Sequence, residues 1–290
     1  MKQRALFLVN RQARRGAQNI EFAAQQLRRS GFELVEVPTE NPLQLSEVIR
    51  AHERTVDLVI VGGGDGTLNA AIAGVMDTQL PLGILPLGTA NDLARTLGIP
   101  TNIDLACATI AGRQMKRIDL GWVNGHYFFN VASLGLSVAI TNRLTKQTKR
   151  RWGVMAYAVA AIQALWKSRP FTATIRSGDR VERVRTIQVT VGNGVYYGGG
   201  LAVADDASIS DDRLDLYSLE IDGFWRWLHV LPAMYQGRHH LYPYVHAQQG
   251  QEFFIDCSRS LSINTDGEIN TQTPAHFKVI PKAISVLVPE

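Results

Sequence analysis

The residues from Val59 to Gly74 read VIVGGGDGTLNAAIAG, an order that predicts a strand, a tight glycine loop and a helix. Glycine permits positive φ angles and lets an anion approach the backbone, and the first turn of a helix offers unpaired N–H groups. The loop therefore favours phosphate. Its spacing lacks the Lys-Ser/Thr pair of a Walker A loop and does not match the G-x-G-x-x-G of a dinucleotide turn.

Asp65 is the unusual residue of this loop. A carboxylate repels phosphate unless a divalent cation or a proton-donating substrate lies between the two groups. Asp65 therefore indicates chemistry on a Mg²⁺-nucleotide. The alternative is a strand-to-helix turn in which Asp65 only caps the helix.

A second loop of the same kind follows in LGILPLGTANDLART, from Leu82 to Thr96. The order is again strand, loop and helix, and Thr89, Asn91 and Asp92 gather hydrogen-bonding groups at the start of that helix. Open parallel sheets bind ligands at the carboxyl ends of their strands. Two such loops predict one shared site.

GGDGT, Gly63 to Thr67, and LPLGTANDLAR, Leu85 to Arg95, resemble the two signature loops of the diacylglycerol kinase catalytic domain, and most closely those of the soluble bacterial lipid kinases. The resemblance implies an enzyme that transfers the γ-phosphate of ATP, with Mg²⁺, to a hydroxyl of diacylglycerol or a related membrane lipid. GGDG alone is also similar to NAD kinases. The alternatives are therefore an NAD kinase-like enzyme and a nucleotide-binding regulator without transfer activity.

The resemblance also implies which residues contact the nucleotide. Thr39 corresponds to a hydroxyl after the second strand, although without the resemblance it reads as a turn or N-cap residue. The remaining implied nucleotide contacts lie in the two loops: Gly63, Gly64, Asp65, Gly66, Thr67, Leu68, Asn69, Ala70 and Thr89.

Near the C-terminus, LSINTDGEIN resembles the DGE motif that supplies the family's general base. Asp266 and Glu268 are two residues apart, and on an extended segment they would point the same way, so that one could position or bind metal while the other takes the proton. The alternative is a plain Asp-Gly hairpin turn. Which carboxylate acts as base stays open.

The segment ASISDDRLDLYS resembles the family's structural Mg²⁺ site. The resemblance implies a side-chain ligand, Asp212, and backbone oxygens of Ile209 and Leu214. Oxygen ligands suit Mg²⁺. The sequence departs from the family pattern because Arg213 stands where the family usually has glycine.

The periodicity predicts α/β architecture followed by β structure. Strands and helices alternate at the N-terminus, which predicts a doubly wound parallel sheet over residues 1–120. Alternating apolar runs then predict antiparallel strands over residues 121–290, among them Arg185 to Val191, with helices at Val154 to Lys167 and Phe224 to Tyr235. The resemblance implies a β-sandwich-like lipid-substrate domain for this second part.

Composition excludes several other classes. The two cysteines, Cys107 and Cys257, are too few for a disulfide framework, and the chain begins with a strand pattern and no signal peptide, which predicts a cytoplasmic protein.

Residues 120–178 carry eight Lys/Arg and no Asp/Glu. The basic run from Arg143 to Arg151 is a solvated face or a peripheral contact with anionic lipid at the inner membrane face. No nucleic-acid motif accompanies it, and the sequence does not indicate an oligomeric state.

Overall fold

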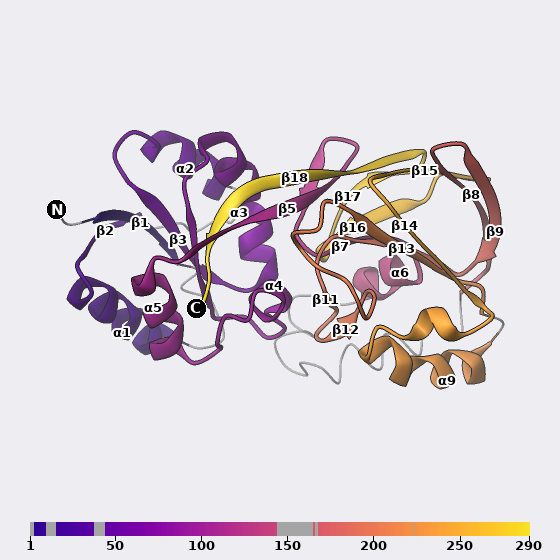
Figure 1. Ribbon diagram of the computed structural model, residues 1–290, viewed down its shortest axis with the longest axis horizontal. Coiled ribbons are helices and arrows are strands. Elements are labelled where there is room, and N and C mark those ends of the chain that lie inside the picture. Colours follow the sequence, from indigo (N-terminus) through magenta and orange to yellow (C-terminus); the bar gives the residue numbers. More distant parts are fainter. Residues whose placement is uncertain (1–2, 10–15, 38–43, 144–164, 166–167, 222) are drawn as a thin grey trace. The chain divides into compact units, whose positions relative to one another are not determined.

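The computed structural model describes residues 3–9, 16–37, 44–143, 165, 168–221 and 223–290 (Figure 1). The chain separates into an N-terminal unit, Met1–Asp119 with Lys282–Glu290, and a C-terminal unit, Leu120–Pro281. The division into domains 1–120 and 121–290 stays a prediction, but the last residues pack with the N-terminal unit. They do so because the end of strand β18, Ala275–Leu287, pairs with strand β4 through Val286 and Leu82.

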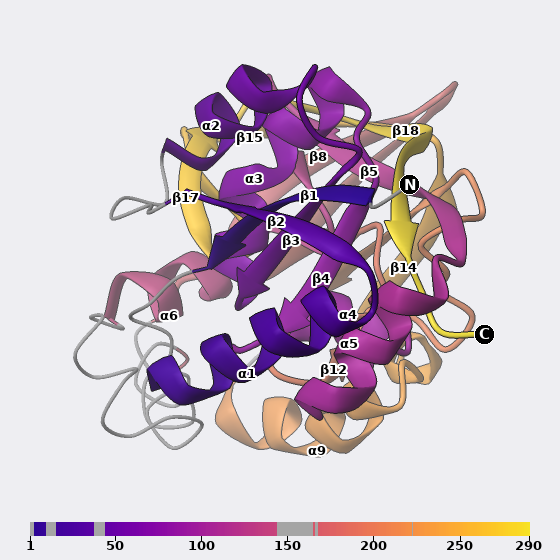
Figure 2. The ribbon, with the colours of Figure 1, turned by 90° about the vertical axis from the view of Figure 1, so that its left-hand side faces the viewer.

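The N-terminal unit contains a parallel sheet in the order β2-β1-β3-β4-β18. Its first four strands are β1 (Gln3–Val9), β2 (Phe32–Glu36), β3 (Leu58–Gly63) and β4 (Leu82–Pro86). Its helices are α1 (Gly16–Arg29), α2 (Leu45–His52), α3 (Asp65–Thr78), α4 (Asp92–Thr96) and α5 (Ile103–Gly112). Figure 2 shows α2 and α3 on one face of this sheet and α1 and α5 on the other, which confirms the doubly wound architecture.

Strands β3 and β4 explain why the two loops meet. Every residue of both strands is buried, as expected for parallel strands covered by helices on both faces. The strands run in register, with Gly63 opposite Pro86, so they end at the same level. The glycine loop and the GTAND loop therefore start side by side at one edge of the sheet.

The C-terminal unit is built from two antiparallel sheets. One has the order β18-β15-β8-β9, with β5 beside β18 and β6 beside β5, and the other has the order β14-β13-β10-β7-β16-β17. Large apolar side chains from both sheets form one core cluster, including Phe128, Phe253, Phe277, Leu216 and Ile263. The predicted β-sandwich-like fold is confirmed. The strands are β5 (Met115–Val123), β6 (His126–Phe128), β7 (Val131–Gly135), β8 (Phe171–Ser177), β9 (Arg180–Thr186), β10 (Gln188–Gly192), β13 (Leu214–Leu219), β14 (Val245–Gly250), β15 (Glu252–Cys257), β16 (Ser262–Thr265) and β17 (Glu268–Gln272).

The prediction of one strand from Arg185 to Val191 is wrong. Strand β9 ends at Thr186 and β10 begins at Gln188, and the two strands belong to different sheets. The Thr186 hydroxyl holds this corner, because its oxygen accepts from the Gln188 N–H at 3.1 Å and donates to the Leu219 carbonyl oxygen at 2.7 Å. A strand that changes sheets keeps its apolar alternation, so periodicity alone does not reveal the corner.

Further elements complete the C-terminal unit. The helices are α6 (Leu136–Arg143), α9 (Phe224–Tyr235) and the short 3-10 helix η2 (His239–Leu241), and a small hairpin joins β11 (Tyr196–Tyr197) to β12 (Leu201–Ala202). Helix α9 was predicted, whereas α6, β7, β14 and β17 were not. Apart from Leu165 and the backbone of Arg143, the predicted helix at Val154 to Lys167 and the basic run up to Arg151 lie outside the described residues. Among the helices that the structure describes, none is long and apolar enough to cross a membrane.

Candidate nucleotide and catalytic site

The glycine loop passes directly from β3 into α3. Gly64 has an extended backbone, with φ −101° and ψ −174°, and its carbonyl oxygen accepts from the N–H groups of Thr67 at 2.9 Å and Leu68 at 3.1 Å. A Cβ added to Gly63 would lie 2.5 Å from the Thr67 side chain, so glycine is needed for the chain to turn tightly over this helix. The exposed Gly66 has open space around it, and the loop therefore presents bare backbone at the helix N-terminus.

The second loop lies against the first. The Leu87 N–H donates to the Gly63 carbonyl oxygen at 2.9 Å. A Cβ on Gly88 would lie 2.4 Å from the Gly64 Cα, so the two loops touch through glycine backbones. The glycine loop and the GTAND loop are therefore in direct contact, as predicted from their positions after adjacent strands.

Asp65 connects these loops. Its Oδ1 accepts from the Leu93 N–H at 3.1 Å, in the first turn of α4. Burial raises the pKa of Asp65 above its usual value, although the N–H groups of Leu93 and its neighbours act in the opposite direction. The sequence left open whether Asp65 only caps its own helix. It caps the helix of the other loop, and it places a carboxylate where the two loops meet.

Asn91 shapes the second loop, and the residues implied by the resemblance did not include it. It is buried and has a left-handed backbone with φ 52°, a conformation that asparagine tolerates better than most residues. Its Oδ1 accepts from the Gly88 N–H at 2.9 Å, and its Nδ2 donates to the Gly88 carbonyl oxygen at 3.1 Å. Asn91 therefore holds the loop in shape and leaves Thr89 exposed at its tip.

The other predicted nucleotide contacts differ in exposure. Thr67, Leu68 and Asn69 are buried in the first turns of α3. The Ala70 carbonyl oxygen accepts from the Ser46 hydroxyl at 2.7 Å, a contact between α3 and α2. Thr39 lies outside the described residues. Nucleotide contact by these residues stays a prediction.

In the C-terminal unit, Asp266 and Gly267 form the two-residue turn between β16 and β17. Their φ values are 48° and 98°, the combination of an Asp-Gly hairpin turn. The Asn264 Oδ1 accepts from the Gly267 N–H at 2.7 Å and closes the turn. The hairpin alternative is thus correct as a description of the backbone.

The Asp266 carboxylate holds the chain between β6 and β7. Its Oδ2 accepts from the Phe129 N–H at 2.6 Å, and its Oδ1 accepts from the N–H groups of Asn130 and Val131, both at 3.0 Å. The expectation that Asp266 and Glu268 share an extended segment and point the same way is wrong, because Asp266 has a left-handed backbone in the turn. Glu268 begins β17 and is exposed, so it is the carboxylate of the pair that can meet a substrate.

Asp266→Asn is expected to destabilise the protein by about 3 kcal/mol, because an amide loses the charge that three backbone N–H groups share and turns its NH₂ toward one of them. For a unit of this size that corresponds to a fall in melting temperature of roughly 6–12 °C. Asp256→Asn is the matched control, since this exposed carboxylate accepts from the N–H of the adjacent Cys257 and holds no distant segment among the described residues. Equal melting temperatures for the two variants would contradict the role assigned to Asp266.

The segment predicted to bind a structural Mg²⁺ contains its own cation. The Arg213 guanidinium forms ion pairs with Asp206, from Nη2 to Oδ2 at 2.9 Å, and with Asp211, from Nε to Oδ2 at 2.9 Å. Ile209 and Leu214 are buried, and Asp212 lies between them with φ 59°. The described residues contain no group of three or more His, Cys, Asp or Glu side chains that could hold a metal ion. Mg²⁺ binding by Asp212, Ile209 and Leu214 stays a prediction, because the ion pairs of Arg213 involve the neighbouring Asp206 and Asp211 and do not test the predicted ligand.

Arg213→Met is expected to lower the melting temperature, because the variant loses both ion pairs, and EDTA tests separately whether the nucleotide-free parent protein holds a metal ion in this segment. The ion pairs are partly exposed, so the loss is modest, about 1 kcal/mol or roughly 2–4 °C. Thermal unfolding with and without EDTA measures both effects. A parent protein that EDTA destabilises would support the metal interpretation of this segment.

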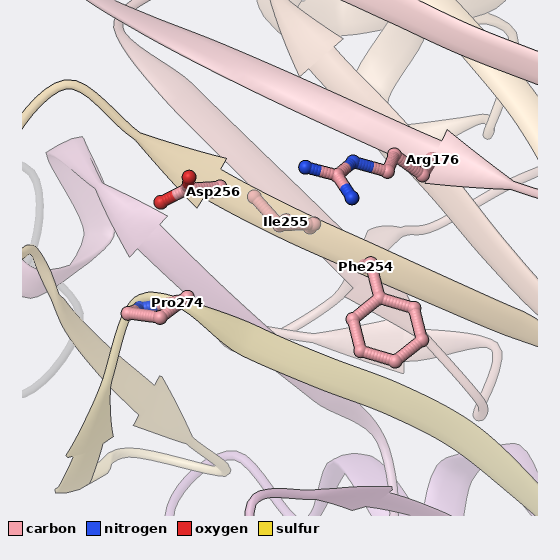
Figure 3. Close-up of a pocket in the computed structure, with 5 residues that line it drawn as sticks. All are labelled: Arg176, Phe254, Ile255, Asp256 and Pro274. Carbon is pink, nitrogen blue, oxygen red and sulfur yellow. The ribbon is translucent and has the colours of Figure 1, made fainter.

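A pocket of about 170 Å³ lies on the exposed face of the first sheet of the C-terminal unit (Figure 3). Arg176 of β8 faces Phe254 of β15 in the strand register, and Ile255, Asp256 and Pro274 complete the lining. Ligand pockets usually enclose about 300–1,000 Å³. This pocket contains none of the predicted site residues and is too small for a nucleotide or a lipid.

Family models match both units of the chain. The diacylglycerol kinase catalytic domain model matches residues 4–123, and the YegS C-terminal NAD kinase beta sandwich-like domain model matches residues 130–288. The first match contains both glycine loops, and the second contains the DGE turn and the Arg213 segment.

Named relatives agree with these matches. A diacylglycerol kinase of Mycobacterium tuberculosis is 30% identical over 277 residues, which cover 92% of this chain and 88% of the relative. A diacylglycerol kinase of Bacillus subtilis is 31% identical over 242 residues, which cover 82% and 79%. The fold is similar to a crystal structure of a diacylglycerol kinase from Bacillus anthracis, with a TM-score of 0.79, 21% identity and coverage of 99% and 97%. With its two signature loops joined in one unit and family models matched along most of its length, the chain belongs to the diacylglycerol kinase catalytic domain family and is a lipid kinase.

Proposed function

We propose that this kinase transfers the γ-phosphate of ATP to a hydroxyl of a membrane lipid, either diacylglycerol or a related glycerolipid or long-chain base, and that it requires Mg²⁺. The observation that carries the proposal is the contact between the two loops, in which Asp65 of the glycine loop accepts from Leu93 of the GTAND loop. That contact places one carboxylate beside the exposed backbone of Gly66, where phosphates would bind.

The N-terminal unit binds ATP in this proposal. The backbone N–H groups at the start of α3 hold phosphate oxygens, and the exposed Thr89 hydroxyl adds a hydrogen bond. Glycine at positions 64 and 88 keeps the loops in contact, since a side chain at either position would approach the other loop too closely. The loop is thereby shaped before the nucleotide arrives, which lowers the entropic cost of holding the phosphates in position.

Asp65 fits a Mg²⁺ ion that arrives with the nucleotide. Mg²⁺ is commonly bound by one or two carboxylates together with phosphate oxygens and water. A single carboxylate beside the phosphate-binding N–H groups matches this pattern. When bound, the ion neutralises charge that develops on the transferred phosphoryl group.

Glu268 is assigned the general base in this proposal. It would accept the proton from the lipid hydroxyl as that oxygen attacks the γ-phosphorus, and ADP would leave. Asp266 acts as a positioning residue, because its carboxylate accepts from three backbone N–H groups and fixes the turn that presents Glu268. Because the acceptor belongs to a bilayer, we place the enzyme at the cytoplasmic face of the membrane, in peripheral contact with it.

Incubation of the purified protein with γ-labelled ATP, Mg²⁺ and extracted membrane lipids tests the proposal. The expected product is a labelled phospholipid, and competition among purified lipids then identifies the acceptor. Label transferred to NAD and not to lipid would support the NAD kinase-like alternative. ATP binding without transfer to either acceptor would support a nucleotide-binding regulator.

A further inference from the structure

Helix α9 has two apolar faces. Trp227, Val230 and Met234 pack against the second sheet of the C-terminal unit, in a cluster that includes Tyr217 and Leu219. Their spacing of three and four residues places them on one side of the helix. That side accounts for the folding of α9 onto the unit, but it leaves the other apolar residues of the helix unexplained.

The second apolar face points to solvent. Trp225 is 78% exposed, Leu228 43% and Tyr235 56%, and the exposed Pro232 lies between the last two. These positions are separated by three, four and three residues, so they form one stripe along the helix. A helix on the surface of a globular protein normally turns charged or polar residues to solvent.

The short helix η2, which packs against α9, carries a further exposed apolar residue. Leu241, at the end of η2, is 70% exposed. The remaining exposed large apolar residues of the described chain are distributed over other elements, and single residues of that kind are normal on protein surfaces. Four such side chains lie between Trp225 and Leu241, and this concentration is not explained by scattered single residues.

The charged residues within this stretch of sequence have one sign. Residues 223–251 contain Arg226, Arg238 and four histidines but no Asp or Glu. Both arginines are exposed, and the Arg226 guanidinium lies 5.9 Å from the centre of the Tyr244 ring, close to the helix surface. This stretch therefore combines exposed aromatic and aliphatic side chains with two arginines. A carboxylate from outside the stretch, that of Asp205, lies 4.0 Å from the His240 ring.

We propose that the outward face of α9, Trp225, Leu228, Tyr235 and the adjoining Leu241, docks onto an anionic lipid bilayer, with Arg226 and Arg238 at the headgroups. The inference rests on the proposed function in one respect, since a lipid acceptor must be collected from a membrane. The helix would lie in the plane of the interface with its apolar stripe among the acyl chains.

The chemistry of the stripe favours a bilayer over a protein partner. Tryptophan and tyrosine are favoured at membrane interfaces, because their rings are apolar and their N–H or O–H groups reach water. The arginines can extend their aliphatic stems along the apolar surface and keep their charges at the headgroup level. Each basic residue near an anionic membrane adds about fivefold to binding.

Sedimentation with vesicles tests docking without any turnover. Vesicles of phosphatidylcholine alone and of phosphatidylcholine with phosphatidylglycerol are mixed with the protein in the absence of ATP and diacylglycerol. Leu228→Glu is expected to weaken binding to the anionic vesicles at least tenfold. Leu105→Glu is the matched control, since Leu105 is 55% exposed on helix α5 of the other unit, and its binding should stay within about twofold of the parent.

Two further variants separate the apolar contribution to vesicle binding from the electrostatic contribution. Trp225→Ser should weaken binding to both kinds of vesicle, whereas Arg226→Glu should weaken binding only to anionic vesicles and reduce its salt dependence. The melting temperature and the oligomeric state of each variant are measured alongside binding. Unchanged binding of both Leu228→Glu and Trp225→Ser would overturn the proposal, and so would a stripe variant that converts a dimer to a monomer, because that result would identify a second copy of the chain as the occupant.

Phosphorylation of a short-chain diacylglycerol dispersed in detergent is measured to distinguish a failure of membrane docking from a failure of the kinase function. A docking variant should retain this activity and lose activity on vesicles. A parent protein that binds vesicles but phosphorylates no lipid would remove the proposed function and leave the docking surface intact.

Discussion

Asp65→Asn is expected to reduce phosphoryl transfer about 1,000-fold or more while leaving the fold intact. Asparagine keeps an oxygen that can accept from the Leu93 N–H, so the contact between the loops survives. It loses the negative charge that would hold Mg²⁺ on the phosphates, and that charge stabilisation contributes several kcal/mol to the barrier. Steady-state kinetics with saturating ATP, together with a thermal melt, measures the two effects separately.

Two other substitutions complete this experiment. Asp65→Ala removes both the charge and the acceptor, and it should additionally lower the melting temperature because the Leu93 N–H is left unsatisfied. Asp77→Asn is the matched control at the other end of α3, where the carboxylate forms an exposed ion pair with Arg50 at 2.7 Å. Asp65→Asn that turns over at the rate of Asp77→Asn would exclude Asp65 from the chemistry.

The pKa of Asp65 adds a check on pH dependence. Because burial raises this pKa, the active carboxylate form is lost at a higher pH than for an ordinary aspartate as the solution is acidified. The stability linked to this group has the opposite direction: it is present at low pH and falls as pH rises through the raised folded-state pKa. In a profile of kcat/KM against pH, Asp65→Asn should therefore abolish the fall in activity at acid pH that protonation of Asp65 causes. The variant should not lose stability at neutral pH.

Glu268→Gln is expected to slow transfer by about 10² to 10⁴ and to leave ATP binding nearly unchanged, since that is the usual contribution of a positioned general base. The side chain is exposed at the start of β17, so the substitution should not disturb packing. Single-turnover transfer to lipid and equilibrium binding of ATP are the two measurements.

Glu252→Gln is the matched control for this variant. It is also an exposed glutamate that begins a strand of the same unit, β15. A Glu268→Gln protein with the transfer rate of Glu252→Gln would remove Glu268 from the mechanism and return the role of base to Asp65. Loss of ATP binding in Glu268→Gln would instead make the residue structural.

The amino-acid sequence by itself determined the architecture and the place of the two loops. Continuous apolar runs such as Leu58 to Val61 identify buried parallel strands, because such strands are covered on both faces. Glycines that end adjacent strands identify the loops, since only glycine permits the contact between Gly64 and Gly88. These signals are local, and a reader of the sequence can find them in any short window.

Only the tertiary structure decided what the acidic residues contact. The partners of Asp65 and Asp266 are backbone N–H groups of Leu93 and of Phe129 to Val131, and backbone groups have no residue type that a sequence could reveal. The same holds for the corner at Thr186, and the pairing of Arg213 with Asp206 and Asp211 became evident only when the chain was folded. Long-range contacts with the main chain leave no periodic pattern, so spacing could place Asp266 and Glu268 together but could not separate the residue that fixes the turn from the one that faces solvent.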